Sequence, residues 1–426
     1  MIYFQTGSPE TALTDADLRA GLFQALEKIS ARSKVLVLPP DGTRAHAHAG
    51  ELTRFAHEFL GDSVEAIMPA LGTHVPMTPE QLRAMFGDLP LELFRPHRWR
   101  EDIVTLGEVP AEFVKDVSDH AVDYAWPVQV NRLLVEGGFD LILSIGQVVP
   151  HEVVGMANHS KNIFVGTGGS EGIHKSHFLG AAYGMEKMMG HADTPVRRVL
   201  NYAAEKIAPE LPVVYVLTVV EAAADGTCPV RGLFIGDDVE CFEAAAALSR
   251  QVNVFELETS LARAVVWLDP DAYHSTWLGN KAIYRTRMAM ADEGELIVLA
   301  PGVETFGEDP EIDRLIRKYG YCGTPAVRAA MEQDETLQNN LSAAAHLIHG
   351  SSEGRFTITY CPGGLTREET ESVGFKYADL EETLQRFQPE GRSDGWHTDA
   401  EGEPFYLITQ PGLGLWCGSE TQENES

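Results

Sequence analysis

The stretch Phe139-Asp-Leu-Ile-Leu-Ser-Ile-Gly146 reads as an apolar β-strand, and a loop rich in glycine and histidine follows it. That loop reads Pro150-His151-Glu-Val-Val-Gly-Met-Ala-Asn-His-Ser-Lys161-Asn-Ile-Phe-Val-Gly-Thr-Gly-Gly-Ser-Glu-Gly-Ile-His174-Lys-Ser-His177. Loops that follow apolar strands carry the chemistry of many α/β proteins. Imidazole changes charge near neutral pH and is the commonest metal ligand, and a lysine beside it offers a covalent anchor. The stretch therefore predicts an α/β fold with a functional site at this strand end.

Strand, loop and helix also alternate before and after this stretch. Apolar runs at residues 34–39, 64–69 and 212–220 predict further strands, and residues 50–60 have the apolar spacing of a helix. Thr78 is followed by proline at the first helical position and glutamine at the third, which predicts a capped helix start. This alternation predicts a doubly wound, mainly parallel sheet.

The same pattern restarts after an alanine-rich helix expected at residues 241–250. A strand at 264–268, a helix at 282–291 and a strand at 295–300 predict a second, smaller α/β domain.

We therefore expect two domains, as the length of 426 residues also favours. The first is a cofactor-binding domain over residues 1–255 and the second covers residues 256–404. The tail 405–426 is expected to pack back on the first domain.

The composition excludes several classes of function. A net charge of −30 disfavours nucleic acid or an anionic membrane as partner, since both are themselves negative. No apolar run reaches the length of a membrane span, and no secretory signal precedes residue 10, so a cytoplasmic location is expected. The five cysteines include no Cys-x-x-Cys pair, which disfavours a disulfide framework and a thiolate zinc site. A small anionic substrate would require a local cationic pocket.

Several side chains that could carry chemistry follow predicted strands. His74 and His151 each come after a strand, where a doubly wound fold presents its ligand site. The turn Asp41-Gly-Thr-Arg44 closes the first strand, and its arginine could hold a carboxylate through its planar fork. His174 and His177 lie three residues apart, so on a helix they could form a zinc pair, although no third ligand is identifiable.

The stretch Gly166-Thr-Gly-Gly-Ser170 could cradle a phosphate with backbone N–H groups. No Gly-Lys-Ser/Thr follows, so it is not a Walker A motif. It is also not a Gly-x-Gly-x-x-Gly directly after a strand, which disfavours a nicotinamide dehydrogenase.

Together these motifs resemble the lactate racemase catalytic subunit family, whose members use a nickel-pincer nucleotide. The resemblance rests on the Asp-x-x-Arg turn, on the Gly-x-His-x-Pro loop around His74, and on the order Pro-His, Lys, His. Lys161 lies ten residues after His151, and His177 lies sixteen after Lys161. The match is clear over residues 35–180 and looser beyond.

The resemblance implies how the cofactor, pyridinium-3,5-bisthiocarboxylic acid mononucleotide nickel, would be held. Lys161 would tether it covalently through a thioamide, and His177 would supply the remaining in-plane nickel ligand. Asp41, Gly168 and Gly169 would lie near the cofactor. Cofactor biosynthesis enzymes would be partners of this protein.

The resemblance also implies the chemistry. His74 and His151 would be the acid/base pair on opposite faces of a 2-hydroxy acid, with Arg44 near the substrate. One histidine would take the hydroxyl proton while C2 gives hydride to the cofactor, and return of the hydride on the other face would invert C2.

The sequence departs from the family in the second domain. Lactate-type members have Tyr-Gln-x-x-Lys-Gly-Met, where this chain has Tyr284-Arg-Thr-Arg-Met-Ala-Met290. The substrate carboxylate would then be bound by Arg285 or Lys281, with Arg287 as a further possibility, and a larger acid such as a gluconate-like aldonate is expected. The alternatives are a racemase of lactate or another short 2-hydroxy acid, a metal-dependent hydrolase, and a non-catalytic relative that binds nucleotide or small acids.

Overall fold

The computed structural model describes residues 1–30 and 32–418, and its chain divides into two compact units. The first unit consists of Met1–Tyr183, Lys187–Glu221 and Cys228–Val252. The second consists of Gly184–Glu186, Ala222–Thr227 and the chain from Asn253 onward. The sequence placed the end of the first domain at residue 255.

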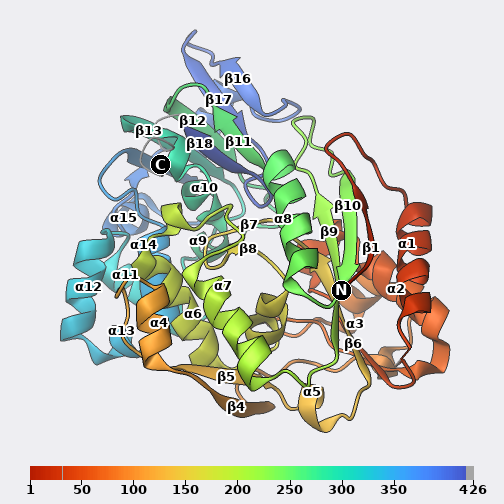
Figure 1. Cartoon of the computed structure of the whole chain (residues 1–426). Coiled ribbons are helices and arrows are strands. Elements are labelled where there is room, and N and C mark those ends of the chain that lie inside the picture. Colours follow the sequence, from red (N-terminus) through yellow and green to blue (C-terminus); the bar gives the residue numbers. More distant parts are fainter. Residues whose placement is uncertain (31, 419–426) are drawn as a thin grey trace. The chain divides into compact units, whose positions relative to one another are not determined.

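A six-stranded sheet of order β1-β10-β9-β6-β2-β3 forms the centre of the first unit (Figure 1). The pairs β2–β3, β2–β6 and β6–β9 are parallel, whereas β10 pairs antiparallel with β9 and β1 with β10. The expected mainly parallel, doubly wound sheet is confirmed, with an antiparallel edge that the sequence did not reveal. The strands of this unit are β1 (Ile2–Gly7), β2 (Val35–Leu38), β3 (Val64–Ile67), β4 (Ile103–Val109), β5 (Trp126–Asn131), β6 (Leu141–Gln147), β7 (Pro150–His151), β8 (Gly155–Met156), β9 (Val213–Val220) and β10 (Val230–Gly236).

Helices cover both faces of this sheet, so its central strands β2, β6 and β9 are mainly apolar. Val35 and Val37 pack into one core with α1 to α3, whereas Leu36 and Leu38 pack into the other with α4 and α6 to α8. Side chains of a strand alternate between faces, and burial on both faces requires an unbroken apolar run. The helices are α1 (Asp15–Lys28), α2 (Ala49–Leu60), α3 (Pro79–Phe86), α4 (Ala111–Val117), α5 (Leu133–Glu136), α6 (Ser170–Tyr183), α7 (Pro195–Tyr202) and α8 (Val239–Asn253), with shorter helical turns η1 (Gly42–Ala47), η2 (Gly61–Ser63), η3 (Leu91–Leu93), η4 (Asn162–Gly166), η5 (Met185–Lys187) and η6 (Ala203–Ile207).

The helix start expected at Thr78 is confirmed in detail. The Thr78 side chain accepts from the Gln81 N–H, and the Gln81 side chain accepts from the Thr78 N–H. Two otherwise unpaired donors of the helix end are satisfied in this way.

A second six-stranded sheet, of order β15-β14-β13-β12-β17-β16, forms the centre of the second unit. Only its edge pair β16–β17 is antiparallel. The strands are β11 (Val254–Leu257), β12 (Leu261–Trp267), β13 (Met290–Ala300), β14 (Thr357–Pro362), β15 (Lys376–Tyr377), β16 (Gly395–Thr398), β17 (Pro404–Ile408) and β18 (Leu415–Gly418). The helices are α9 (Thr276–Gly279), α10 (Lys281–Tyr284), η7 (Arg287–Ala289), α11 (Pro310–Tyr319), α12 (Thr324–Gln333), α13 (Glu335–Asn339), α14 (Leu341–His349), α15 (Arg367–Ser372) and α16 (Leu380–Phe387).

Two expectations for this region were wrong. The helix expected at 282–291 is interrupted: α10 ends at Tyr284, and β13 already begins at Met290. The tail expected to pack back on the first domain instead adds strand β17 to the second sheet, and β18 pairs with β11. Sequence periodicity did not reveal this because strand pairing is a long-range choice. The rest of the expected tail, residues 419–426, lies outside the described residues.

Among the described residues, no helix is both long and apolar enough to cross a membrane.

Candidate active site

The candidate site lies at the carboxyl end of the first sheet, at its topological switch point. From β2, the chain adds β3 on one side and later β6 on the other. The loops after these strands therefore diverge and leave a crevice, which is where open α/β sheets bind ligands. Asp41 and Arg44 follow β2, His74 follows β3, and His151 follows β6.

The structure pairs Asp41 directly with His74. Burial alone would raise the pKa of the Asp41 carboxyl, but hydrogen bonds from His74 and Thr43 and the charge of Arg44 lower it to about 2. The carboxylate is therefore ionised, and it accepts from His74 Nδ1 at 2.6 Å. The proton of the neutral ring thus lies on Nδ1, and Nε2 carries the lone pair. The sequence had placed Asp41 near the cofactor or Arg44, not against His74.

His151 is fixed in the opposite way. Its Nδ1 accepts a hydrogen bond from the backbone N–H of Val153 at 3.1 Å, so the neutral ring carries its proton on Nε2. The residue is 7% exposed, whereas the His74 side chain is 42% exposed. The two predicted acid/base histidines therefore differ in tautomer and in exposure.

Lys161 occupies the start of the π-helical turn η4 and is partly buried. Desolvation lowers the pKa of its amine to about 7, helped by the positive charge of Arg44 and opposed by Glu152 and Asp41. Arg44 and Asp41 lie in the turn after β2, and Glu152 lies next to His151. The predicted site residues are therefore close enough for their charges to change one another's pKa values. A lysine with a pKa near neutrality is a nucleophile at physiological pH.

His177 lies on α6, and one of its two ring nitrogens is hydrogen-bonded to the backbone of the same helix. Its Nδ1–H donates to the carbonyl of Ile173 at 2.7 Å, which leaves the Nε2 lone pair for a ligand. Burial and the nearby Lys161 charge lower the pKa of this imidazole to about 4, so it stays neutral. A metal-binding histidine commonly fixes its second nitrogen on a carbonyl in this manner.

The zinc alternative finds no support in the arrangement of side chains. Within residues 1–30 and 32–418, no three His, Cys, Asp or Glu side chains are placed to share a metal ion. His174 packs edge-on against the ring of Trp99 at 6.3 Å between centroids. A metal here would need most of its ligands from a bound cofactor.

A buried arginine that local sequence did not single out supports the segment before Lys161. Arg197 donates to the carbonyls of Met156 and Asn158 and to the Ser160 hydroxyl, at 2.7–3.0 Å. Asn158 and His159 both have positive φ angles, of 70° and 56°. Such angles strain residues other than glycine, so the arginine bonds hold a backbone that would not persist alone.

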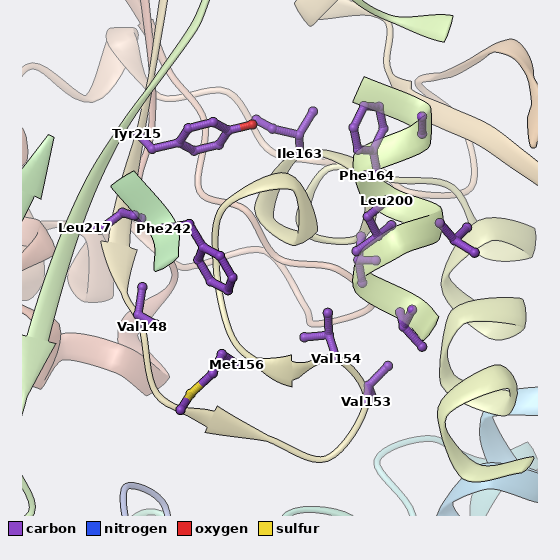
Figure 2. Packing of buried hydrophobic residues seen from close by; sticks show 14 of the residues in the cluster. Val148, Val153, Val154, Met156, Ile163, Phe164, Leu200, Tyr215, Leu217 and Phe242 are labelled. Atoms are coloured by element: carbon purple, nitrogen blue, oxygen red, sulfur yellow. The ribbon is translucent and has the colours of Figure 1, made fainter. Parts of the chain in front are cut away.

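The ring of His159 is part of an apolar cluster. It stacks on Tyr215 at 4.0 Å and on Phe242 at 5.3 Å between centroids. Figure 2 shows Tyr215 and Phe242 in the same apolar cluster as Ile163 and Phe164 of η4 and Met156. The lysine loop is therefore anchored both by this packing and by Arg197, whose guanidinium lies over the Phe242 ring at 4.1 Å.

The glycines proposed to cradle a phosphate are required by the protein's own packing. A Cβ on Gly168 would lie 2.1 Å from the Phe164 carbonyl oxygen, and one on Gly169 would lie 2.5 Å from Gln129 Oε1. The Gly168 carbonyl accepts from Nε2 of the buried His97 at 3.1 Å. Close packing accounts for both glycines, and their role toward a cofactor stays a prediction.

The substrate residues expected in the second domain lie in the second unit. Arg285 is 3% exposed, and its guanidinium contacts the Gly414 carbonyl at 3.4 Å. Lys281 lies over the ring of Tyr273 at 5.9 Å. Arg287 pairs with Glu186 at 2.8 Å and donates to the Ser351 carbonyl at 2.9 Å, so its charge is used within this unit.

Comparison with known proteins gives one family and one fold. Residues 20–189 match the lactate racemase N-terminal domain family. The chain resembles the crystal structure of a protein from Thermotoga maritima, with 26% identity, a TM-score of 0.80, and coverage of 96% of this chain and 99% of that one. It shares the fold of the lactate racemase apoprotein from Thermoanaerobacterium thermosaccharolyticum, with 15% identity, a TM-score of 0.67 and coverage of 95% and 93%.

None of the curated protein sequences compared with the chain matches it. The matched domain spans β2, β3, β6 and α6, which carry the side chains described above. Residues 20–189 of this chain are therefore similar to the N-terminal domain of lactate racemases, and the chain as a whole shares the fold of a lactate racemase.

Proposed function

We propose that this protein inverts C2 of a 2-hydroxy acid larger than lactate, with a nickel-pincer nucleotide as cofactor. The observation that carries the proposal is that Lys161 and His177 lie close enough for the lysine charge to lower the pKa of the imidazole. The Lys161 amine has a pKa of about 7. The His177 imidazole is neutral and uses Nδ1 for its hydrogen bond to Ile173, so a metal would bind at Nε2. One side chain suits covalent attachment and the other suits metal ligation.

The described residues fit this cofactor. Lys161 would form the thioamide link, because its amine is about half neutral at pH 7 and can attack a thiocarboxylate carbon of the cofactor, with loss of water. His177 would be the single protein ligand to nickel, which agrees with a site that gathers no cluster of three ligands of its own. When bound, the cofactor supplies a centre that takes up and returns hydride.

The proton steps belong to the two histidines. His74 presents a lone pair on Nε2 and accepts the hydroxyl proton of one stereoisomer, and Asp41 stabilises the imidazolium that forms. His151 presents an Nε2–H, which can donate to the oxygen at C2 from its own side. For the opposite stereoisomer the roles exchange, so His151 must give up its bond from Val153 while it serves as base.

Arg44 supports recognition of the substrate carboxylate. It belongs to η1, next to Asp41, and its charge acts on Lys161. A planar guanidinium binds a carboxylate with two parallel hydrogen bonds. The proposed contribution of Arg285 and Lys281 to a larger substrate is separate from this contact.

The test is C2 inversion by protein co-produced with the cofactor biosynthesis enzymes. A panel of 2-hydroxy acids is incubated in deuterated water and separated on a chiral column. We expect inversion with the C2 hydrogen largely retained, fastest for a hydroxylated acid such as gluconate. Rapid deuterium incorporation at C2 would refute hydride transfer, and turnover of lactate alone would refute the larger substrate.

A further inference from the structure

A carboxamide with one unpaired end lies at the switch point of the first sheet. Gln147 is the last residue of β6 and is 3% exposed. Its Nε2 lies 2.9 Å from Nε2 of His46, which belongs to η1 after the neighbouring strand β2. Its Oε1 is buried and has no hydrogen-bond partner among the described residues. Local sequence did not single out Gln147 or His46.

The unpaired end does not depend on how the amide is oriented. If the amide were rotated by half a turn, Oε1 would accept from His46 and Nε2 would be left without a partner instead. The neighbouring Thr218, opposite Gln147 on β9, does not resolve this, because its hydroxyl donates to the Ala47 carbonyl at 3.0 Å and forms no hydrogen bond with the Gln147 side chain. One polar end of Gln147 therefore lacks a partner in either case.

Buried polar groups in folded proteins are nearly always hydrogen-bonded, because an unpaired one costs free energy. Each exception calls for an explanation, and a bound ligand that supplies the missing partner is one. Gln147 has the right location for this, since its partner His46 lies on the same turn as Asp41 and Arg44. Along the chain, Gln147 also precedes His151 by only four residues.

A hydroxyl and a carboxylate of the substrate differ in how well they can bond to the free end of Gln147. A hydroxyl group both donates and accepts, so it satisfies the free end of Gln147 in either amide orientation. A carboxylate only accepts, and Arg44 is the better partner for it. The free end therefore suits a hydroxyl rather than the carboxylate of an acid.

We propose that Gln147, held in place by His46, is a specificity residue that binds the C3 hydroxyl of the substrate. The preferred substrates are then 2,3-dihydroxy acids. This inference rests on the proposed function, because it assumes that a 2-hydroxy acid binds at this sheet edge. It adds a named contact in the first unit, independent of Arg285 and Lys281.

The test compares acids that differ only in the C3 hydroxyl. The two matched pairs are glycerate with lactate, and gluconate with 3-deoxygluconate. For the cofactor-loaded wild type and Gln147→Met, the ratio of kcat/KM within each pair is measured by chiral analysis. Binding is measured in parallel by calorimetric titration with acids already equilibrated at C2, so that no net turnover occurs. Gln251→Met, at an exposed position of α8, is the matched control.

We expect the wild type to favour the hydroxylated acid, and Gln147→Met to reduce that preference by about 10- to 100-fold, the effect of one buried hydrogen bond. The control should keep the wild-type ratio. Gln147→Asn, which withdraws the amide by one methylene and keeps it polar, should also lose the preference if the Met variant does not fold.

The outcomes separate this inference from the proposed function. Inversion of 2-hydroxy acids with no preference for the C3 hydroxyl, or with a preference that Gln147→Met and Gln147→Asn retain, would overturn the specificity role alone. An absence of inversion for every acid, with hydroxyl-dependent binding lost in the Gln147 variants, would overturn the proposed reaction and support the binding contact.

Discussion

Lys161 of the first unit and Arg287 of the second are both cations withdrawn from water, but they are surrounded very differently. Arg287 is 3% exposed, and it is paired with Glu186 and bonded to the carbonyls of Ile348 and Ser351. The Lys161 amine forms no hydrogen bond and no ion pair with any described residue, and its pKa falls to about 7. The Arg287 guanidinium stabilises the fold through these bonds, whereas the Lys161 amine has no such partner and lowers the stability of the folded protein.

This difference explains why the two residues carry different arguments. A buried charge with a complete set of partners is weak evidence for function, because structural ion pairs are common. A buried amine with a strongly lowered pKa and no partner is a functional-site candidate. The comparison therefore favours Lys161 as the reactive residue and removes Arg287 from the possible substrate ligands.

The largest expected effect is on covalent loading. Protein co-produced with the cofactor biosynthesis enzymes should carry an adduct on Lys161 and about one nickel per chain, by the family resemblance. Lys161→Arg retains a charge but offers no nucleophilic amine, so both adduct and inversion activity should vanish. Intact mass and peptide mapping measure this. Unmodified Lys161 in an active preparation would contradict the assignment.

The next effect is on turnover. His74→Gln and His151→Gln should each lower kcat by about 10²–10⁴-fold, the usual scale for acid–base catalysis. Nickel content should persist in both, because neither ring is the predicted metal ligand. His177→Ala should instead lose nickel. Near-wild-type kcat in either Gln variant would show that the switch-point histidines are not the acid/base pair.

The third effect is on stability, with opposite signs for the two cations. Arg287→Met removes the donor to the Ser351 carbonyl and the partner of Glu186, and should lower the free energy of unfolding by about 2–4 kcal/mol. The Lys161 amine has a lower pKa folded than unfolded, so the folded state loses stability as the pH falls from about 10 to 7. Lys161→Met removes this penalty and should raise the stability of cofactor-free protein at pH 7 by about 2–4 kcal/mol, after discounting for partial exposure.

Denaturant unfolding of both variants at pH 7 and pH 10 measures this contrast. The advantage of Lys161→Met should shrink at pH 10, where the unfolded lysine is also partly neutral. A stabilised Arg287→Met, or a destabilised Lys161→Met, would reverse the interpretation of the two charges.

The smallest effect concerns the support beneath the lysine loop. Burial, with the charge of Arg197, lowers the pKa of His159 to about 3 in the folded state, against about 6.5 in the unfolded state. The folded protein is therefore at its full stability above pH 6.5 and becomes less stable as the pH falls toward 3, because only the unfolded state then binds the proton. His159→Phe keeps the stack on Tyr215 and Phe242. It should reduce the slope of stability against pH between 6 and 4 by up to about 1.4 kcal/mol per pH unit. An unchanged slope would show that His159 does not resist protonation in the folded state.

Much of the first unit could be predicted from local sequence. The runs at β2, β6 and β9 are mainly apolar because helices cover both faces of the sheet, and burial of that kind is visible in composition. The capped start of α3 depends on Thr78, Pro79 and Gln81 alone. The candidate histidines could be found because parallel strands bring their following loops to one edge.

Local sequence failed where partners come from far along the chain. The antiparallel strand β1, the addition of β17 to the second sheet and the early start of β13 all depend on strand pairing between distant segments. Periodicity describes one segment at a time, so it cannot choose between such pairings.

The sequence by itself therefore specified an α/β chain with histidines, a lysine and an arginine at the strand ends of one sheet. Tertiary structure alone fixed their chemistry. It brought Asp41 to His74 across 33 positions and His46 to Gln147 across 101. It also withdrew Lys161 from water without a partner while giving Arg287 a full set. The physical reason is that tautomer, proton affinity and unpaired donors depend on distance and burial, which are set only when the strands assemble.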